Sequence, residues 1–136
     1  MIIFRNGFIC LFFEPATDIL SFEMPNVDSV VMPEMVRSLN IIVEHTRNYD
    51  VKRILLDARN TDIWVEEKEY ADIIAAFYHN LSSTRVQRIA RVVKIESKRE
   101  QIVKKVLDAA TLPMQVQRFT EEASAYKWLL EATNTN

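Results

Sequence analysis

The first third of the chain has the short hydrophobic pattern of β-strands. Residues 2–4 and 8–13 flank Asn6-Gly7, a dipeptide typical of tight hairpin turns. Residues 8–13 are almost continuously apolar, which predicts a strand covered on both faces. In residues 19–24 apolar and polar positions alternate, which predicts a strand with one exposed face, near the edge of a sheet.

From residue 33 onward the period changes to that of helices separated by short strands. Helices are predicted over residues 33–47, 66–81 and 98–110, and a last helix follows Thr120, its expected cap. Ser97 and Glu100 have the spacing of a capping box. Strands are predicted over residues 53–57, 88–95 and 114–119, and residues 133–136 are expected to fray. The positions expected to face the core include Met35, Val36, Leu39, Ile42 and Val43, then Tyr70, Ile74, Phe77 and Leu81, then Val103 and Ala110, and finally Tyr126, Leu129 and Leu130.

The order of these elements predicts a single α/β domain over residues 1–136. Antiparallel N-terminal strands are followed by α-β-α-β-α-β-α, and alternating units joined by short loops form parallel sheets. The predicted sheet is therefore mixed. We expect the helices to cover it unevenly and to leave one face partly open.

Composition excludes several kinds of site. Gly7 is the only glycine of 136 residues, so the glycine-rich loops that bind nucleotides and the GxSxG turn of hydrolases cannot be written. The net charge of −2 argues against a nucleic-acid binder. Cys10 lies in an apolar run and is expected to be a buried, inert thiol. No segment reads as a signal peptide or an integral membrane span, which predicts a cytoplasmic protein.

Polar side chains follow the strand predicted over residues 53–57. Ligands of open α/β sheets bind beyond the carboxyl ends of parallel strands, and Asp57, Arg59, Asn60 and Trp64 lie there, with Lys94 after the next strand. These five residues are the predicted binding site for a ligand or partner. The structural alternative is that Asp57 accepts loop N–H groups and Arg59 pairs with a carboxylate.

The chain shows no pattern that dictates a reaction. No nucleophile–base pair is visible, and the spacing of Asp57 and Asp62 in a loop fixes no catalytic distance. His45 and His79 each fall near the end of a helix, and no cluster has metal-ligand spacing. We therefore predict no catalytic residues, no metal and no cofactor.

Charged residues are segregated along the sequence. Acidic residues concentrate between Asp57 and Asp72, and basic residues between Arg85 and Lys105. The basic strip could hold an anionic partner or a lipid headgroup, or the two stretches could screen each other on adjacent elements. The members of the basic strip are Arg85, Arg88, Arg91, Lys94, Lys98, Arg99, Lys104 and Lys105.

Two short motifs resemble a known family. Leu-Leu-Asp-Ala-Arg-Asn at residues 55–60 and Glu-Glu-Ala-Ser-Ala-Tyr-Lys-Trp-Leu at residues 121–129 are similar to the SpoIIAA-like, or STAS-like, proteins of bacteria. The resemblance implies a STAS-type fold, used in the best-studied relatives as a protein-interaction module switched by phosphorylation. The serine of that switch has no counterpart here, because Thr61 is the only hydroxyl in the loop of residues 57–62. The phosphoserine switch is therefore not expected.

Two functions from different classes remain open. The first is a non-catalytic STAS-like interaction or regulatory module that binds another protein or forms a homodimer. The second is a carrier for a small apolar or amphipathic ligand held between the helices and the sheet. An enclosed apolar pocket would favour the carrier, and a flat apolar patch would favour the interaction module.

Overall fold

A six-stranded sheet forms the centre of the molecule. The computed structural model describes residues 1–131, and the predicted fraying of residues 133–136 lies outside this range. The strands are β1 (Ile2–Arg5), β2 (Cys10–Glu14), β3 (Ile19–Glu23), β4 (Arg53–Asp57), β5 (Arg88–Val92) and β6 (Gln115–Phe119). The helices are α1 (Met32–Asn48), α2 (Glu67–Leu81), α3 (Lys98–Ala109) and α4 (Glu122–Leu130), and a 3-10 turn (Ser29–Val31) precedes α1.

The strands lie side by side in chain order, β1 to β6. The first three are antiparallel and the last four are parallel, so β3 belongs to both arrangements. This confirms the predicted mixed sheet with antiparallel N-terminal strands. The placement of β3 near an edge was wrong, because β3 pairs with β2 on one side and with β4 on the other.

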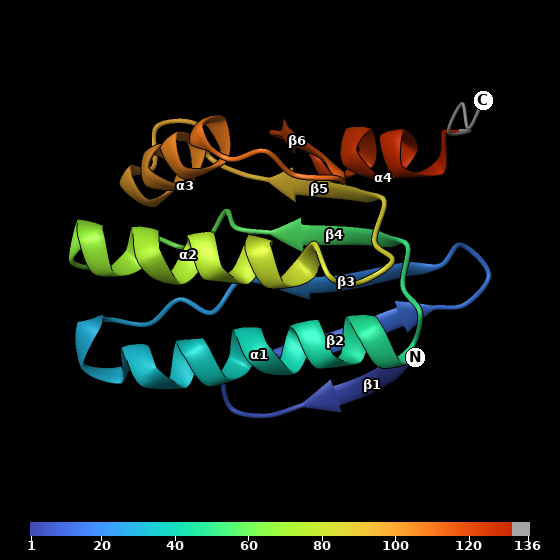
Figure 1. The fold of residues 1–136 in the computed structure, drawn as a ribbon, viewed down its shortest axis with the longest axis horizontal. Helices are drawn as coiled ribbons and strands as arrows, with labels where there is room; N and C mark the ends of the chain where they lie inside the picture. The colour runs from blue at the N-terminus through green and yellow to red at the C-terminus, as the bar shows by residue number, and fades with distance from the viewer. Residues whose placement is uncertain (132–136) are drawn as a thin grey trace.

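Helices cover the two faces of the sheet unequally. The first three helices pack side by side on one face, over the main core (Figure 1). Helix α4 packs on the opposite face against β4, β5 and β6, where Ala125 and Leu129 meet Ile19, Leu55 and Val92. On that second face, the half formed by β1 and β2 has no covering helix among residues 1–131.

The open half of the second face corrects the reading of β2. Successive apolar residues predicted a strand covered on both faces, but Leu11 and Phe13 are buried while Phe12 is 45% exposed. Cys10, predicted to be buried, is only half-buried and lies on the same open face. The apolar run identified the strand correctly. Its second face is open because α4, the helix on that face, covers β4, β5 and β6 and not β2.

The helix termini follow their capping chemistry with some exceptions. Pro33 occupies the first turn of α1, and the Glu66 side chain accepts hydrogen bonds from the backbone N–H groups of Lys68 and Glu69. Ser97 caps α3 by accepting from the N–H of Glu100 at 3.4 Å. The predicted cap of α4 was wrong, because Glu121 rather than Thr120 holds the N-cap position and makes no side-chain capping bond.

Some inward positions were also predicted wrongly. Ala110 lies beyond α3 and is exposed, and Leu130 is exposed on α4, where Ala125 is buried instead. Val36 is exposed on α1. Strand β5 ends at Val92, three residues before the predicted limit, and Ile95 is exposed.

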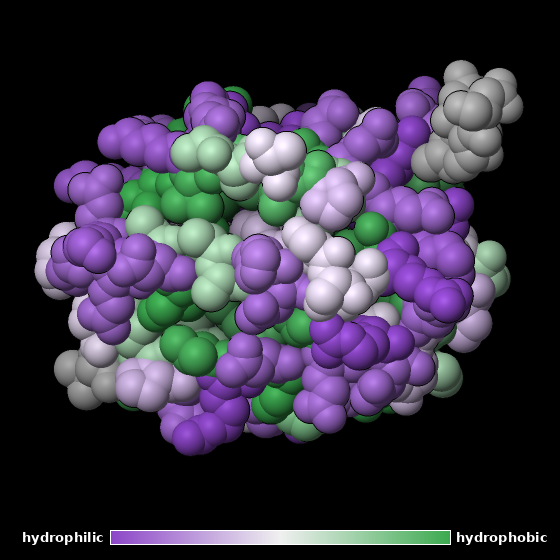
Figure 2. Space-filling model, in the orientation of Figure 1, coloured by the Kyte–Doolittle hydropathy of each residue, from purple (hydrophilic) through white to green (hydrophobic). Residues whose placement is uncertain are grey.

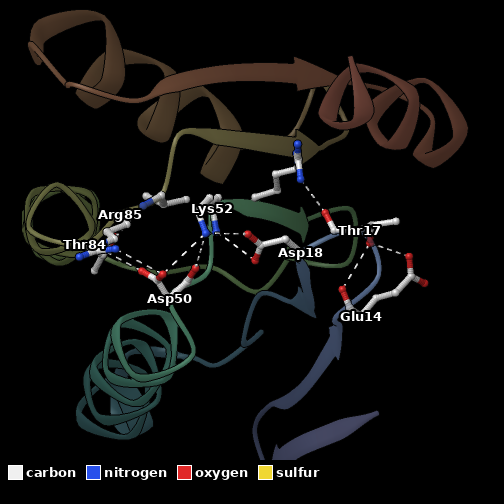
Figure 3. Close-up of polar contacts among 9 residues, drawn as sticks. Glu14, Thr17, Asp18, Asp50, Lys52, Thr84 and Arg85 are labelled. Carbon is white, nitrogen blue, oxygen red and sulfur yellow. Dashed lines mark hydrogen bonds and ion pairs between the residues drawn. The ribbon is translucent and has the colours of Figure 1, made fainter. Parts of the chain in front are cut away.

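A cluster of ion pairs ties the loops at the amino end of the parallel strands. Lys52 lies between Asp18 and Asp50, with Nζ–Oδ2 distances of 3.3 and 3.7 Å (Figure 3). Arg85 approaches Asp50 at 3.4 Å. Asp18 and Asp50 both have positive φ, which aspartate tolerates better than most residues. These charges satisfy one another, and they stabilise turns rather than offer a site.

Candidate functional site

The carboxyl ends of the parallel strands carry an open groove between the start of α2 and the start of α3. We call this the carboxyl-edge groove; its volume is about 770 Å³. One wall comes from the loop that follows β4, and the other comes from the loop after β5 and the first two turns of α3. Its principal lining residues are Arg59, Trp64, Lys94, Lys98, Arg99 and Ile102.

Apolar side chains form part of the groove. Trp64 is 70% exposed and Ile63 beside it is also exposed, while Val65 and Ile102 lie deeper. Figure 2 shows apolar surface between α2 and α3, bordered by hydrophilic side chains. An exposed indole beside such a surface offers a flat partner for stacking or apolar contact.

Positive charge exceeds negative charge in the groove. Five of its lining residues are cationic and three are acidic, although the whole chain has a net charge of −2. Lys105 approaches Glu67 at 3.8 Å across the groove. Among residues 1–131, Lys94 and Lys98 have no carboxylate within ion-pair distance, and both side chains are exposed. These two lysines are therefore available to an anion.

Arg59 and Asp57 form a two-point ion pair. The guanidinium donates from Nε to Oδ1 at 3.0 Å and from Nη2 to Oδ2 at 2.7 Å, and the Arg59 backbone N–H also donates to Oδ1. Burial alone would raise the pKa of Asp57, but the hydrogen bonds from Arg59 hold that pKa below its ordinary value. This geometry is the structural alternative that the sequence left open.

The structure brings three of the five predicted site residues into the groove. Arg59, Trp64 and Lys94 line it together. Asp57 instead lines a hollow of about 510 Å³ on the open sheet face, beside the β1–β2 turn and α4. Asn60 is exposed and contributes to neither surface.

Arg99 is the groove residue that sequence reasoning placed wrongly. It belonged to the predicted basic strip, but only 3% of it is exposed. Its guanidinium donates to the backbone carbonyls of Pro25 and Val27 and lies 5.0 Å from the ring centroid of Tyr70. Burial lowers the pKa of Arg99. No alternation in the sequence signals this burial, because the carbonyls come from a loop more than 70 residues away.

Other members of the basic strip are also buried. Arg91 and Glu100 each have 3% of their side chain exposed and form a two-point pair at 2.6 and 2.9 Å. Arg118 approaches the same Glu100 carboxylate at 3.4 Å. Arg88 donates to Gln115 and to the backbone carbonyl of Trp128. The basic residues of 85–105 therefore do not form one continuous surface, so an anion-binding strip over this whole stretch, one of the two readings left open, is not supported.

Glu100 explains why the capping box is only half formed. The Ser97 hydroxyl caps the N–H of Glu100, as the spacing predicted. The Glu100 carboxylate binds Arg91 and Arg118 instead of returning to the N–H of Ser97. That N–H donates to the carbonyl of Lys94 at 3.1 Å.

The hydroxyls of the groove are engaged in local hydrogen bonds. Thr61 donates to the carbonyl of Ala58 at 2.7 Å and is 4% exposed.

Within residues 1–131, no group of three histidine, cysteine or acidic side chains is placed to hold a metal ion. In the same part of the chain, no helix combines the length and apolarity that a membrane crossing requires.

No family model, no curated protein and no solved structure matches this chain.

Proposed function

We propose that the protein is a non-catalytic interaction module of the STAS-like type, which recognises its partner at the carboxyl-edge groove. The observation that carries this proposal is the groove itself. It combines an exposed tryptophan, apolar walls and two unpaired lysines in one open surface. Exposed aromatic and cationic side chains are typical of surfaces that bind other proteins.

The order of secondary-structure elements supports the STAS-like assignment. Antiparallel strands precede the alternating helices and strands, and the two motifs of the resemblance fall at the end of β4 and within α4. The Arg59–Asp57 pair fixes the first motif at the carboxyl end of β4, and Arg59 also approaches Glu122 of α4 at 3.8 Å. The two motifs therefore meet at one place in the fold.

The side-chain chemistry of the groove supports binding rather than catalysis. Catalytic hydroxyls need an adjacent base, and neither Thr61 nor Ser97 has a histidine beside it among the groove residues. His45 and His79 belong to the last turns of α1 and α2, at the opposite end of the helices from the groove. The residues present can hold a partner by charge and apolar contact.

The carrier alternative has less support. The cavity enclosed beneath the helices by Met24, Leu56, Tyr70 and Val103 has a volume of about 10 Å³. Pockets that hold small ligands are usually several hundred Å³. An apolar ligand between the helices and the sheet would have to displace core side chains.

A phosphorylation switch in the loop after β4 has no accessible hydroxyl. Thr61 is buried and its hydroxyl is engaged by a backbone carbonyl. We propose that partner exchange does not depend on phosphorylation of this loop. Mass spectrometry of the partner-bound and partner-free protein tests this part of the proposal, and a phosphate on Thr61 in only one of the two forms would contradict it.

Capture experiments with matched variants test the proposed function. The wild-type protein, a Trp64→Ala/Lys98→Glu variant and a Lys104→Ala control are immobilised and exposed to lysate of the source organism. Lys104 lies on the same helix but pairs with Asp108 and does not line the groove. We expect quantitative mass spectrometry to find a protein retained by wild type and control and lost from the groove variant.

The same retained set on all three forms would contradict the proposed site. The partner is another protein or a second copy of this chain. Native mass spectrometry of the purified protein distinguishes the two through subunit count.

A further inference from the structure

The carboxyl-edge groove carries a local charge that suits a particular anion. Its cationic residues are Arg59, Lys94, Lys98, Arg99 and Lys105, and its acidic residues are Asp62, Glu67 and Glu96. Arg59 already pairs with Asp57, which lies outside the groove, so the other four cations exceed the three acids by one charge, in a chain that is negative overall. A phosphate monoester near neutral pH carries a charge between −1.5 and −2, and Lys94 and Lys98 supply two exposed positive charges to balance it.

Hydrogen-bond donors without acceptors meet at one point of the groove. The N–H of Glu100 is capped by Ser97, and that of Gln101 donates to the Ser97 carbonyl. Among residues 1–131, the backbone N–H groups of Lys98 and Arg99 have no acceptor. They lie in the first turn of α3, where the helix dipole favours negative charge.

A second, independent observation is the incomplete hydrogen bonding of Arg99. Arg99 is buried, and it lines both the groove and the small cavity beneath the helices. Its Nη atoms donate to two carbonyls, but its Nε has no hydrogen-bond partner among the described residues. Asp62 favours the charged form of Arg99, but burial outweighs this effect and holds the pKa of Arg99 below its ordinary value. The buried guanidinium therefore keeps one donor, Nε, for which the described residues supply no acceptor.

We propose that the first turn of α3, with Lys94, Lys98 and Arg99, binds a phosphate monoester group. This inference rests on the proposed function, because it assigns the phosphate to a phosphorylated side chain of the partner. The adjoining Trp64 and Ile102 take an apolar side chain next to that phosphate. In this proposal the protein binds a phosphate group carried by another chain. Its own loop after β4 has no accessible hydroxyl that could be phosphorylated.

An anionic membrane surface fits the groove less well. The first turn of α2 carries Glu67 and Glu69, and its N-cap is Glu66. Glu67 lines the opposite side of the groove, and a membrane docked there would bring anionic headgroups against this acidic helix start. A single phosphate held at α3 stays near Lys94 and Lys98 and avoids that repulsion.

Amide chemical shifts test the phosphate site directly. The ¹⁵N-labelled full chain is titrated at constant ionic strength with inorganic phosphate, with a capped pentapeptide that has phosphoserine between leucines, and with the same peptide bearing serine. We expect the amides of Lys98 and Arg99 to shift with both phosphates. The phosphopeptide should bind at least tenfold more tightly than inorganic phosphate, and the serine peptide should leave the spectrum unchanged.

Variants provide the control. Lys94→Ala/Lys98→Ala changes two exposed side chains, so the fold should persist while phosphopeptide affinity falls at least tenfold. Lys104→Ala should stay within twofold of wild type. Absence of phosphate-dependent shifts at Lys98 and Arg99 would overturn the site. Equal affinity for inorganic phosphate and phosphopeptide would overturn the assignment to a phosphorylated partner.

The two proposals fail in different ways. If capture from lysate depends on the groove but resists phosphatase treatment, the proposed function stands and the phosphate inference is wrong. If phosphate binds but no protein is retained through the groove, the proposed function is wrong.

Discussion

Single residues beneath the groove hold charge that is rarely buried. Arg91 and Glu100 are almost fully enclosed and satisfy each other at two points, while Arg99 uses carbonyls and the face of Tyr70. Such groups add less stability than their contacts suggest, because removing charges from water is expensive. Removing one partner alone is much worse, because it leaves the other charge buried without compensation.

The Arg91–Glu100 pair gives the first prediction. Glu100→Ala should lower the free energy of unfolding by about 3–5 kcal/mol, since it leaves Arg91 buried and unpaired. Asp108→Ala removes an exposed carboxylate paired with Lys104 on the same helix and should cost less than about 1 kcal/mol. Urea denaturation measures both. Similar losses of unfolding free energy in the two variants would contradict the larger cost expected from leaving Arg91 buried without its partner.

Tyr70 gives a prediction for alkaline pH. Burial raises the pKa of its phenol to about 12, so the folded state keeps a proton that the unfolded state releases near pH 10. Stability from this group is complete below pH 10 and is lost as pH rises toward 12. The wild type should therefore lose roughly 2–3 kcal/mol more than Tyr70→Phe between pH 9.5 and 12. Urea denaturation at several pH values measures this loss. An equal loss of unfolding free energy in the two proteins would contradict the raised pKa of Tyr70.

The positions of the helices and strands could be predicted from local sequence pattern. The exposure of each sheet face could not, because it depends on which helices pack on that face. The helical stripe of Tyr70, Ile74 and Phe77 and the proline at the start of α1 led to correct helices. The exposure of Phe12 was missed, because an apolar strand looks the same whether one or both of its faces are covered. Helix α4 covers β4, β5 and β6. This placement depends on the tertiary arrangement of the chain, which hydrophobic periodicity does not predict.

The same limit applies to the candidate site. The carboxyl-end rule selected Arg59, Trp64 and Lys94, and these do line one groove. It also selected Asp57, whose side chain is on the other face because residues alternate along β4. Arg99 could not be recognised, since its neighbours come from the distant loop at residues 25–27.

The second face of the sheet gives a matched pair of variants, one on β4 and one on β2. Leu55 and Phe12 lie on the same sheet face, but Leu55 packs under α4 while Phe12 is largely open. Leu55→Asp should prevent stable folding, because it buries an unpaired carboxylate. Phe12→Asp should cost no more than about 1 kcal/mol. Circular dichroism and thermal melting compare them, and a Leu55→Asp protein that melts cooperatively near the wild-type temperature would contradict the position of α4.

At the scale of the whole molecule, the two ends of the parallel strands differ. The amino end is closed by mutually paired charges around Lys52. The carboxyl end combines unpaired lysines, free helix N–H groups and an exposed indole in one groove. Lys52 is paired at the amino end, whereas Lys94 and Lys98 have no carboxylate within ion-pair distance among residues 1–131. We therefore propose recognition at the carboxyl end.

Site-specific photo-crosslinking in cells measures that assignment most directly. A benzophenone amino acid replaces Trp64 in the groove or, as the control, Tyr49 at the amino end, where the side chain is also exposed. We predict a discrete protein adduct on illumination of the position-64 variant, which Lys94→Ala/Lys98→Ala in the same chain removes, and no adduct from position 49. Adducts from position 49 and none from position 64 would contradict the account.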